Sequence, residues 1–463
     1  MKMKHHLLES KSLFSLLRIL VLLFPVSVYA QVNETQRRPN VILIYSDDQG
    51  WADLGVYGSP DLYTPNLDQL ARKGVRFNQF YSASPVCSPS RAAVLTGRFP
   101  QRAGLPGNAS SHLGEAGMPG HQYTLAEMFK DAGYRTGHVG KWHVGYDEET
   151  TPRAQGFDYS FGFMGGVIDN YSHFFYWDGP NRHDLWRNDQ RLYRDGEYFP
   201  DLMVDEASTF LNQHQEEPFF LYFAINIPHY PLQPEKKWLD YYREKGVATP
   251  RDMYGAFVST MDERIGMLLS ELDRLGLTEN TIVIFQADQG FSEEERTFGG
   301  GGSAGELRGS KFSLFEGGIR VPAIISWPEI IPADQVRDQF SANIDWFPTL
   351  AEYCEITLPK RKIDGKSLIG IIQGKESQSN HDVFYWKSGS RDGLPQWAIR
   401  EGPWKLLHNP IQADQDELNA DRFFLVNLDS DPSEQKNLSD SQPEVVARLK
   451  SLFERWEVEV EKK

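Results

Sequence analysis

The run CSPSR, residues 87–91, begins with Cys87, the residue of this chain best suited to act as a nucleophile. The chain has two cysteines, Cys87 and Cys354, so no internal disulfide can form if Cys87 is consumed by chemistry. The structural alternative is a small buried thiol, which packs as a hydrophobic residue. A thiol redox role is a weaker hypothesis because the chain has no CxxC motif. The surrounding residues must decide between a nucleophile and a packed thiol.

Polar residues suited to binding a cation follow two apolar runs. Asp47 and Asp48 come after one run, and Asp288 and Gln289 come after another. Adjacent carboxylates raise each other's pKa unless a cation neutralises them. An oxygen-only set of donors predicts Ca²⁺ or Mg²⁺ rather than Zn²⁺. The alternative is that either aspartate only caps the turn after its strand.

Three continuous apolar, β-rich runs predict buried strands over residues 41–45, 219–227 and 281–285. Capping and glycine signals predict helices over residues 65–73, 125–132 and 250–275. Strands alternating with helices predict an α/β domain with a mostly parallel central sheet flanked by helices. The ligand site of such a sheet lies beyond the carboxyl ends of its strands. Because Pro228 and His229 follow the second run, we expect polar residues from all three strands at one rim.

The last hundred residues have a different pattern. After about residue 359 the alternation gives way to short strand-like pieces over residues 383–386, 396–400 and 404–407, followed by a helix over 443–460. This order predicts a smaller antiparallel α+β subdomain over residues 361–463, after a catalytic domain over residues 31–360.

The first thirty residues have the pattern of a signal peptide. Basic residues precede a short apolar run over 19–28, and the small residues Val28 and Ala30 suit a cleavage site. The run is too short to cross a bilayer, and no later segment is apolar enough. Export without disulfides is typical of a bacterial periplasm or exterior. Nothing in the net charge of −16 favours nucleic-acid binding, which needs a basic face.

Taken together, the ordered motifs resemble those of the type I sulfatases of the alkaline phosphatase-like superfamily, including arylsulfatases and polysaccharide sulfatases. CSPSR is similar to their Cys-x-Pro-x-Arg signature. Residues 89–104, residues 137–145 (GHVGKWHVG), the pair Pro228-His229 and residues 311–328 resemble further blocks in family order. The resemblance spans nearly the whole chain after the signal peptide and implies an alkaline phosphatase-like fold and a sulfatase activity.

The resemblance also implies a metal site and a modification. In the family the signature cysteine is oxidised during export to formylglycine (3-oxoalanine) by a maturation enzyme. Asp47, Asp48, Asp288 and the modified Cys87 would hold Ca²⁺. Gln289 stands where relatives have asparagine, so it keeps the carbonyl donor but adds a methylene.

The remaining implied roles concern the sulfate group. Arg91 would steady the formylglycine, and Lys141 and Lys311 would grip sulfate oxygens. His143 would orient or deprotonate the formylglycine hydrate, and His229 would protonate the leaving alcohol. One hydroxyl of the hydrate attacks sulfur, and deprotonation of the second expels sulfate and restores the aldehyde, which gives covalent catalysis in two steps. Taken singly, each lysine could be a solvated surface residue and each histidine a satisfied polar one.

The substrate is expected to be a sulfated carbohydrate. Nine of the twenty-one residues from Phe157 to Trp177 are aromatic, against 13% of the whole chain. Aromatic faces beside polar groups suit sugar rings, although part of such a segment can be core. A similar segment lies near the pocket in family relatives, which makes His173 the expected substrate contact. The alternatives are a phosphodiesterase or phosphonate monoester hydrolase on the same scaffold, and a non-catalytic carbohydrate-binding relative.

Overall fold

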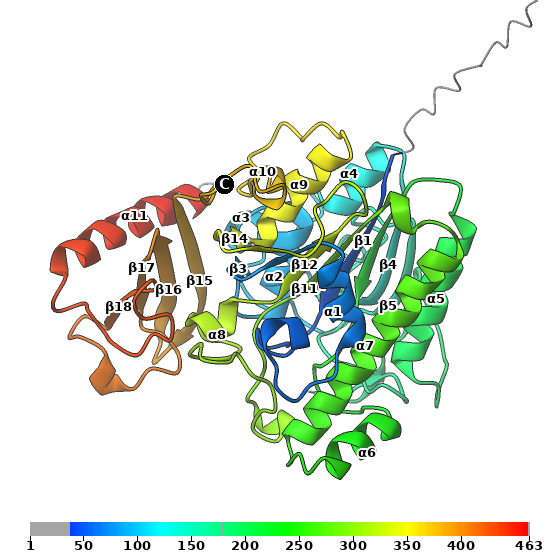
Figure 1. Cartoon of the computed structure of the whole chain (residues 1–463), viewed down its shortest axis with the longest axis horizontal. Helices are drawn as coiled ribbons and strands as arrows, with labels where there is room; N and C mark the ends of the chain where they lie inside the picture. Colours follow the sequence, from blue (N-terminus) through cyan, green and yellow to red (C-terminus); the bar gives the residue numbers. More distant parts are fainter. Residues whose placement is uncertain (1–37, 178, 462–463) are drawn as a thin grey trace, which may run out of the picture. The chain divides into compact units, whose positions relative to one another are not determined.

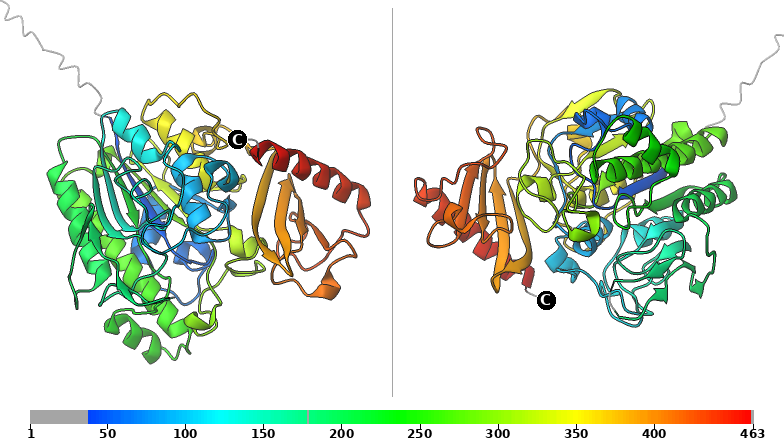
Figure 2. Two further views of the ribbon diagram at one scale, coloured as in Figure 1. Left: turned by 180° about the vertical axis from the view of Figure 1, so that it is seen from behind. Right: turned by 90° about the horizontal axis from the view of Figure 1, so that it is seen from below.

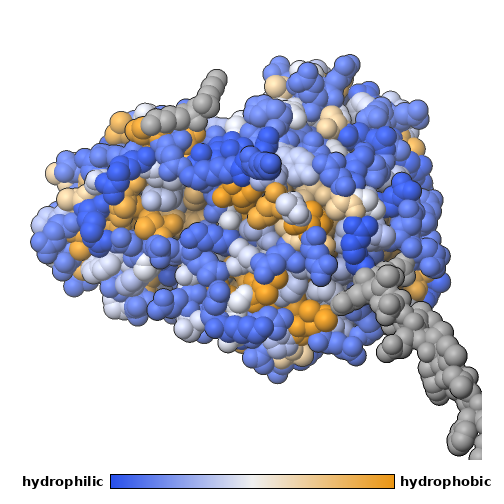
Figure 3. Space-filling model, turned by 90° about the horizontal axis from the view of Figure 1, so that it is seen from above, coloured by the Kyte–Doolittle hydropathy of each residue, from blue (hydrophilic) through white to orange (hydrophobic). Residues whose placement is uncertain are grey.

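The computed structural model describes residues 38–177 and 179–461, so the expected signal peptide lies outside the described residues. Residues from Arg38 onward form one compact unit, shown in Figure 1. Within the described ranges no helix has the length and apolar character needed to cross a membrane. Seen from above in Figure 3, the surface is mostly hydrophilic, and its hydrophobic side chains lie in separate small patches.

A mixed sheet of ten strands organises this unit, and its five central strands, β11 to β5 in spatial order, run parallel. Antiparallel pairs flank the parallel centre, because β12 lies against β11 and β8 against β5. The predicted α/β fold with a mostly parallel central sheet is confirmed. In spatial order the strands are β13 (Gln335–Arg337), β2 (Val75–Phe77), β12 (Ala323–Ser326), β11 (Thr281–Ala287), β1 (Asn40–Ser46), β10 (Phe219–Ala224), β4 (Arg135–Lys141), β5 (Tyr159–Phe163), β8 (Trp186–Arg187) and β9 (Gln190–Arg191).

Helices cover both faces of the sheet (Figures 1 and 2). Successive side chains of a strand point to opposite faces, and β1 follows this rule. Val41 and Leu43 belong to one core cluster, whereas Ile42 and Ile44 belong to the other. The first cluster includes α2 (Cys87–Thr96), α4 (Leu125–Asp131) and α9 (Trp346–Tyr353), and the second includes α1 (Pro65–Arg72), α5 (Phe199–Gln213) and α7 (Arg251–Arg274). All seven residues of β1 are buried, as its continuous apolar run predicts.

The predicted helices are confirmed to within a few residues, and α4 shows why. The Thr124 hydroxyl accepts a hydrogen bond from the Glu127 amide at 3.1 Å, and the Glu127 carboxylate accepts one from the Thr124 amide at 2.7 Å. This reciprocal capping satisfies two amides that a helix start leaves without partners. The shorter elements are α3 (Pro100–Ala103), α6 (Lys236–Glu244), α8 (Glu316–Ile319), α10 (Ile369–Ile372), β3 (Phe80–Tyr81), β6 (Phe174–Phe175), β7 (Arg182–His183) and β14 (Ser341–Ala342).

The C-terminal part is a four-stranded antiparallel sheet packed against one helix, in orange and red in Figure 1. Its strands are β15 (Val383–Arg391), β16 (Leu394–Glu401), β17 (Trp404–His408) and β18 (Phe423–Asn427), and the helix is α11 (Pro443–Glu461). The ring of Phe453 in α11 stacks on Trp397 in β16 with centroids 4.1 Å apart. The predicted antiparallel α+β subdomain is therefore present, with β18 as a strand that the sequence pattern did not reveal. The boundary at residue 360 remains a prediction.

A buried ion pair joins this subdomain to the main sheet domain. Lys405 of β17 is fully buried, and its ammonium lies 2.8 Å from Glu316 of α8 and 2.9 Å from Glu434. The Glu434 carboxylate also accepts a hydrogen bond from the backbone amide of Glu316 at 2.5 Å. Two buried carboxylates thus share the Lys405 ammonium group, and Glu316 has a second, longer ion pair with Arg320 at 3.6 Å.

Lys405→Met is therefore expected to lower the free energy of unfolding by about 3–5 kcal/mol, because it leaves buried charges uncompensated. Urea denaturation followed by circular dichroism measures this loss. Lys450→Met is the matched control, since the Lys450 side chain is 50% exposed and pairs with Glu454 only at 3.9 Å. Equal effects of the two substitutions would contradict the structural importance of the buried pair.

Candidate active site

Four neighbouring parallel strands deliver the predicted site residues to one edge of the sheet. Asp47 and Asp48 follow β1, Asp288 and Gln289 follow β11, and His229 follows β10. This is the arrangement expected from sequence, because carboxyl ends of parallel strands meet at one edge. The fourth strand, β4, ends at Lys141, with His143 two residues later. Its sequence, RTGHVGK, has two glycines and little apolar character, so periodicity did not identify it as a strand.

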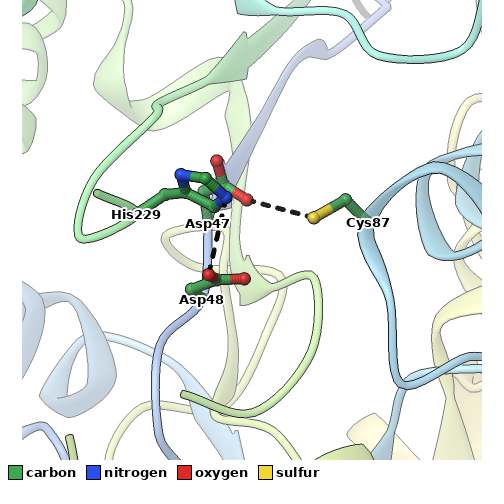
Figure 4. Close-up of side chains that lie close together, drawn as sticks. All are labelled: Asp47, Asp48, Cys87 and His229. Atoms are coloured by element: carbon green, nitrogen blue, oxygen red, sulfur yellow. Dashed lines mark hydrogen bonds and ion pairs between the residues drawn. The ribbon is translucent and has the colours of Figure 1, made fainter. Parts of the chain in front are cut away.

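The helix α2 brings Cys87 to this edge from the other side. Cys87 is the first residue of α2, where the positive end of the helix dipole favours negative charge. Figure 4 shows its side chain directed at Asp47, with His229 directed at Asp48. The thiol donates to the Asp47 carboxylate at 3.7 Å and accepts from the Gln289 amide at 3.5 Å. Every residue of α2 is buried, so the Cys87 backbone is held by packing on all sides.

Three buried cations neutralise the three aspartates. The Lys141 ammonium donates to both oxygens of Asp47 at 2.9 and 2.7 Å. The Arg91 guanidinium lies 2.9 Å from Asp288 and 3.4 Å from Asp47.

The third cation, the Lys311 ammonium, lies 2.8 Å from Asp48. Each of the six side chains is at most 4% exposed. Charges with so little contact with water are stable in a protein only if each is paired with an opposite charge.

The pKa values of the carboxyl groups diverge under these influences. Burial raises the pKa of each group. For Asp47 the charges of Lys141 and Arg91 overcome this effect and hold its pKa far below the ordinary value. Burial raises the pKa of Asp48 to about 6, and the charge of Asp47 adds to this rise against the opposing effect of Lys311. Burial and Asp47 raise the pKa of Asp288 to about 7. Two carboxylates are thus costly to ionise, and a further cation beside them would lower that cost.

The donor set fits a hard divalent cation. Asp47, Asp48 and Asp288 supply carboxylate oxygens, and Gln289 supplies an amide oxygen. The Oε1 atom of Gln289 is buried and has no hydrogen-bond partner among the described residues, while its Nε2 atom contacts Asp48. A half-turn of this amide would aim the unpartnered oxygen at the carboxylates, where a cation would coordinate it. The longer side chain of glutamine therefore still reaches the cluster.

The cluster opens into a cavity of about 300 Å³. Its wall includes Cys87, His143, His229 and Lys311, together with Phe175, Trp177 and Tyr230. A larger cavity of about 770 Å³ lies elsewhere and is lined by residues such as Leu113, Tyr146, Asp147 and Trp186. None of the predicted catalytic or metal-binding residues lines that larger cavity. The smaller cavity is therefore the candidate active site, because it contacts the nucleophile candidate and its charged neighbours.

The two histidines at the cavity differ in their bonding. The Nδ1 atom of His229 donates to the Tyr230 carbonyl at 2.8 Å, which leaves Nε2 facing Asp48 at 3.6 Å. The Nδ1 atom of His143 has no hydrogen-bond partner within the described part of the chain. Burial lowers the pKa of both side chains well below the ordinary value, and Lys141 contributes to this lowering. Both imidazoles are therefore neutral in the ligand-free protein.

Constrained backbone surrounds these groups. Asp48, His143 and Phe312 have φ angles of 61°, 53° and 76°, in the left-handed region that non-glycine residues seldom occupy. Gly166 lies against His143, because a Cβ atom at Gly166 would come within 2.7 Å of the imidazole. Such strain persists only where the surrounding structure enforces it, and it gathers at functional sites.

The segment that carries Lys311 is held by the C-terminal subdomain. The Gln396 side chain of β16 donates to the Phe312 carbonyl at 2.9 Å and accepts from the Leu314 amide at 3.2 Å. The Ser313 hydroxyl donates to the Ile411 carbonyl at 2.9 Å. On the other side of Lys311, the Ser310 amide donates to the Gln412 side chain at 3.0 Å. The subdomain contributes no predicted site residue, but it fixes the backbone before and after Lys311.

His173 is the predicted site residue that the structure does not bring to the cavity. It is completely buried, and its Nε2 atom donates to the Glu197 carbonyl at 3.0 Å. The described residues that line the cavity include Phe175 and Trp177 from the same segment, but not His173. The role of His173 as a substrate contact therefore stays a prediction, and Phe175 and Trp177 are the residues of this segment that the structure places at the cavity.

This fold, with its charged cavity and the cysteine at the start of a buried helix, defines a hydrolase of anionic esters. The chain matches the family model described as Sulfatase over residues 39–356 and the model described as N-sulphoglucosamine sulphohydrolase, C-terminal, over residues 309–459. The chain therefore belongs to the sulfatase family and is a sulfuric ester hydrolase.

Named relatives agree with this assignment. N-acetylgalactosamine-6-sulfatase of Canis lupus familiaris is 36% identical over 373 residues, which cover 75% of this chain and 68% of the relative. Arylsulfatase A of Homo sapiens is 34% identical over 457 residues, which cover 90% and 87%. The solved structure of Ps i-CgsB in complex with k-i-k-neocarrahexaose superposes with a TM-score of 0.81 at 28% identity and covers 91% of this chain and 93% of that chain.

Gln289→Ala is expected to weaken Ca²⁺ binding by about tenfold or more, because it removes one oxygen donor from the set. Gln289→Asn should retain most of the affinity, since it keeps the amide oxygen. Isothermal titration of the metal-stripped protein measures both. Gln190→Ala, an exposed site, is the control, and an affinity equal to that of the control would exclude Gln289 as a ligand.

Proposed function

We propose that this protein hydrolyses sulfate esters of a carbohydrate, with formylglycine made from Cys87 as the nucleophile and a Ca²⁺ ion held by Asp47, Asp48, Asp288 and Gln289. The observation that carries the proposal is the meeting of Cys87, three aspartates and three cations at one cavity in a chain of the sulfatase family. Export to the periplasm or the cell exterior, as expected from residues 1–30, would bring the enzyme to such polymers.

The environment of Cys87 supports modification rather than thiolate chemistry. Burial raises the pKa of the Cys87 thiol to about 12, although Lys141 and Lys311 act against it. At neutral pH the group is therefore a protonated thiol, and only the thiolate is a good nucleophile. Formylglycine supplies a hydrated aldehyde, whose hydroxyl can attack sulfur. Arg91 would hold this residue in place, since its guanidinium is fixed by Asp288 and by the Lys141 carbonyl at 3.2 Å.

The lysines would bind the sulfate group. Cleavage of a sulfate monoester moves negative charge onto the leaving oxygen, so it needs cations around the sulfate and an acid at the bridging oxygen. Lys141 and Lys311 now hold Asp47 and Asp48, and Ca²⁺ on those carboxylates would free both ammonium groups for sulfate oxygens. Distant surface acids are screened beyond about 8 Å at physiological salt. The overall charge of −16 therefore does not prevent the binding of an anion.

The histidines would carry the protons. His229 presents Nε2 to the cavity while its Nδ1 hydrogen is held by the Tyr230 carbonyl, so Nε2 is the atom that can receive a proton and pass it to the leaving oxygen. The negative charge of a bound sulfate ester favours the protonated form. His143 lines the same cavity and would orient or deprotonate the nucleophile through its unpartnered nitrogen.

Aromatic walls support a carbohydrate substrate. Phe175, Trp177 and Tyr230 line the cavity, and Trp177 is 40% exposed at its mouth. The Arg296 guanidinium lies over the Trp177 ring at 3.1 Å, which places a cation beside an aromatic face. Sugar rings stack on such faces while their hydroxyl and acidic groups bond to neighbouring polar groups. The names of the N-acetylgalactosamine-6-sulfatase relatives and the oligosaccharide bound to the i-CgsB structure favour the same substrate class.

Formylglycine at position 87 is expected when the protein is made with a suitable maturation enzyme. Mass spectrometry of the tryptic peptide from Phe77 to Arg91 distinguishes thiol from aldehyde. Cys87→Ala should abolish sulfate release, whereas Cys354→Ala should retain it, because Cys354 is buried in the core and away from the cavity. Full activity in protein that contains only the unmodified thiol would overturn this mechanism.

The substrate class is tested by measuring sulfate released from a panel of sulfated mono- and oligosaccharides. Trp177→Ala is expected to raise the KM for the preferred oligosaccharide by about tenfold, because stacking on an exposed indole contributes about 1 kcal/mol or more. Trp238→Ala, which removes a half-buried indole outside the cavity, is the control. Aryl phosphates and phosphonate esters belong in the same panel. Efficient turnover of these or of aryl sulfates, with every sulfated sugar ignored, would refute the carbohydrate assignment.

A further inference from the structure

A second group of metal-binding side chains lies outside the catalytic cluster, at the hairpin of β6 and β7. His183 in β7 is paired with Phe174 in β6, and His173 directly precedes β6. The Asp184 amide also donates to the His173 carbonyl at 2.9 Å, which continues this pairing. The hairpin thus sets the two histidines side by side, and Asp195 reaches them from the turn that follows. Each of the three offers one ligand atom, and these atoms lie within 4.8 Å of one another.

The buried nitrogen atoms of this group lack partners. His173 is fully buried and His183 is 5% exposed. The Nδ1 atom of His173 and both ring nitrogens of His183 make no hydrogen bond to any described residue. The Nε2 atom of His183 lies 3.4 Å from the Asp195 carboxylate, whose side chain is 65% exposed. Buried polar atoms are normally satisfied, so unpartnered nitrogens on two neighbouring imidazoles beside a carboxylate indicate a place for a ligand.

We propose that His173, His183 and Asp195 form a second metal site, distinct from the catalytic one, that takes Zn²⁺ or a similar divalent transition metal. Two imidazoles and one carboxylate suit such ions, whereas the oxygen donors of the catalytic cluster suit Ca²⁺. Three protein ligands leave one position of a tetrahedral ion for water, and the exposure of Asp195 gives that position access to solvent.

The surroundings of the histidines match those of metal ligands. A histidine ligand usually donates its second ring N–H to a carbonyl or carboxylate, which fixes its tautomer. The Nε2 hydrogen of His173 is held in this way by the Glu197 carbonyl, so the free electron pair is on Nδ1. Packing holds the other ring, because His183 lies between Tyr193, with centroids 4.4 Å apart, and Phe174, at 5.4 Å.

A metal at this site would stabilise the hairpin that carries part of the active-site wall. Phe175 of β6 lines the active-site cavity, and Trp177 lines it two residues later. A metal that joins both sides of the hairpin would hold this aromatic wall in place. The short strands β6 and β7 have two residues each, and a pair this short has little stability of its own.

Zinc binding to the full-length protein tests the proposal. The protein is stripped with a chelator, its catalytic site is saturated with excess Ca²⁺, and Zn²⁺ is titrated by calorimetry. One zinc ion per chain is expected. Co²⁺ in its place should give the strong visible absorption of a four-coordinate ion.

Asp195→Asn should weaken zinc binding by about tenfold or more, and as an exposed substitution it leaves folding intact. His183→Gln should do the same. His214→Ala is the matched control, because His214 and Glu217 form another histidine and acid pair, at 3.5 Å on the surface. The proposal is overturned if no zinc binds, if Asp195→Asn and His183→Gln bind it as tightly as the control, or if Cys87→Ala removes it, since the ion would then occupy the catalytic cluster.

Discussion

The site depends on a balance between three buried carboxylates and three buried cations. Asp47, Asp48 and Asp288 lie at the edge of the sheet in a region with almost no contact with water, and Lys141, Lys311 and Arg91 neutralise them. The interaction of unit charges about 4 Å apart is roughly 4 kcal/mol at an effective dielectric constant near 20. A dication added to this balanced group leaves an excess of positive charge, and an anionic ester reduces that excess. Metal and substrate would therefore favour each other's binding, and the lysines would exchange carboxylate partners for sulfate oxygens.

Most of this arrangement could be predicted from the sequence because it follows from strands. The runs that became β1, β10 and β11 are buried on both faces and hence continuously apolar, which makes them visible without a structure. The polar residues after them had to meet at one edge of a parallel sheet. The strand β4 could not be predicted in this way, because it contains glycines instead of a continuous apolar run. These glycines allow neighbouring backbone to approach closely. A Cβ atom at Gly140 would come within 2.1 Å of the Ala224 carbonyl oxygen. Lys141 and His143 were found by their motif alone.

Other features could not be predicted from the sequence, because they depend on the side to which each side chain points and not on composition. Two of the nine aromatic residues from Phe157 to Trp177, Phe175 and Trp177, line the cavity, and the sequence does not state which ring faces which side. Phe161 and Phe163 are buried in the sheet, whereas Trp177 reaches the cavity. The proximity of His173 to His183 likewise depends on a two-residue strand register, in which His183 pairs with Phe174, and no periodicity reveals it. The strand β18, FFLVN, was not predicted; it begins fifteen positions after the end of its partner β17, and its apolar run is four residues long.

The contacts of Gln396 with the backbone around Lys311 have a consequence for how this architecture can change. Lys311, which we propose binds the sulfate group, is followed by backbone that a strand from the last hundred residues holds in place. The C-terminal part is therefore not a detachable module that could be exchanged freely between relatives. A chimera would keep its sulfate-binding geometry only if the incoming segment restored a side-chain amide at that point of the junction, so the two parts of the chain are constrained to diverge together.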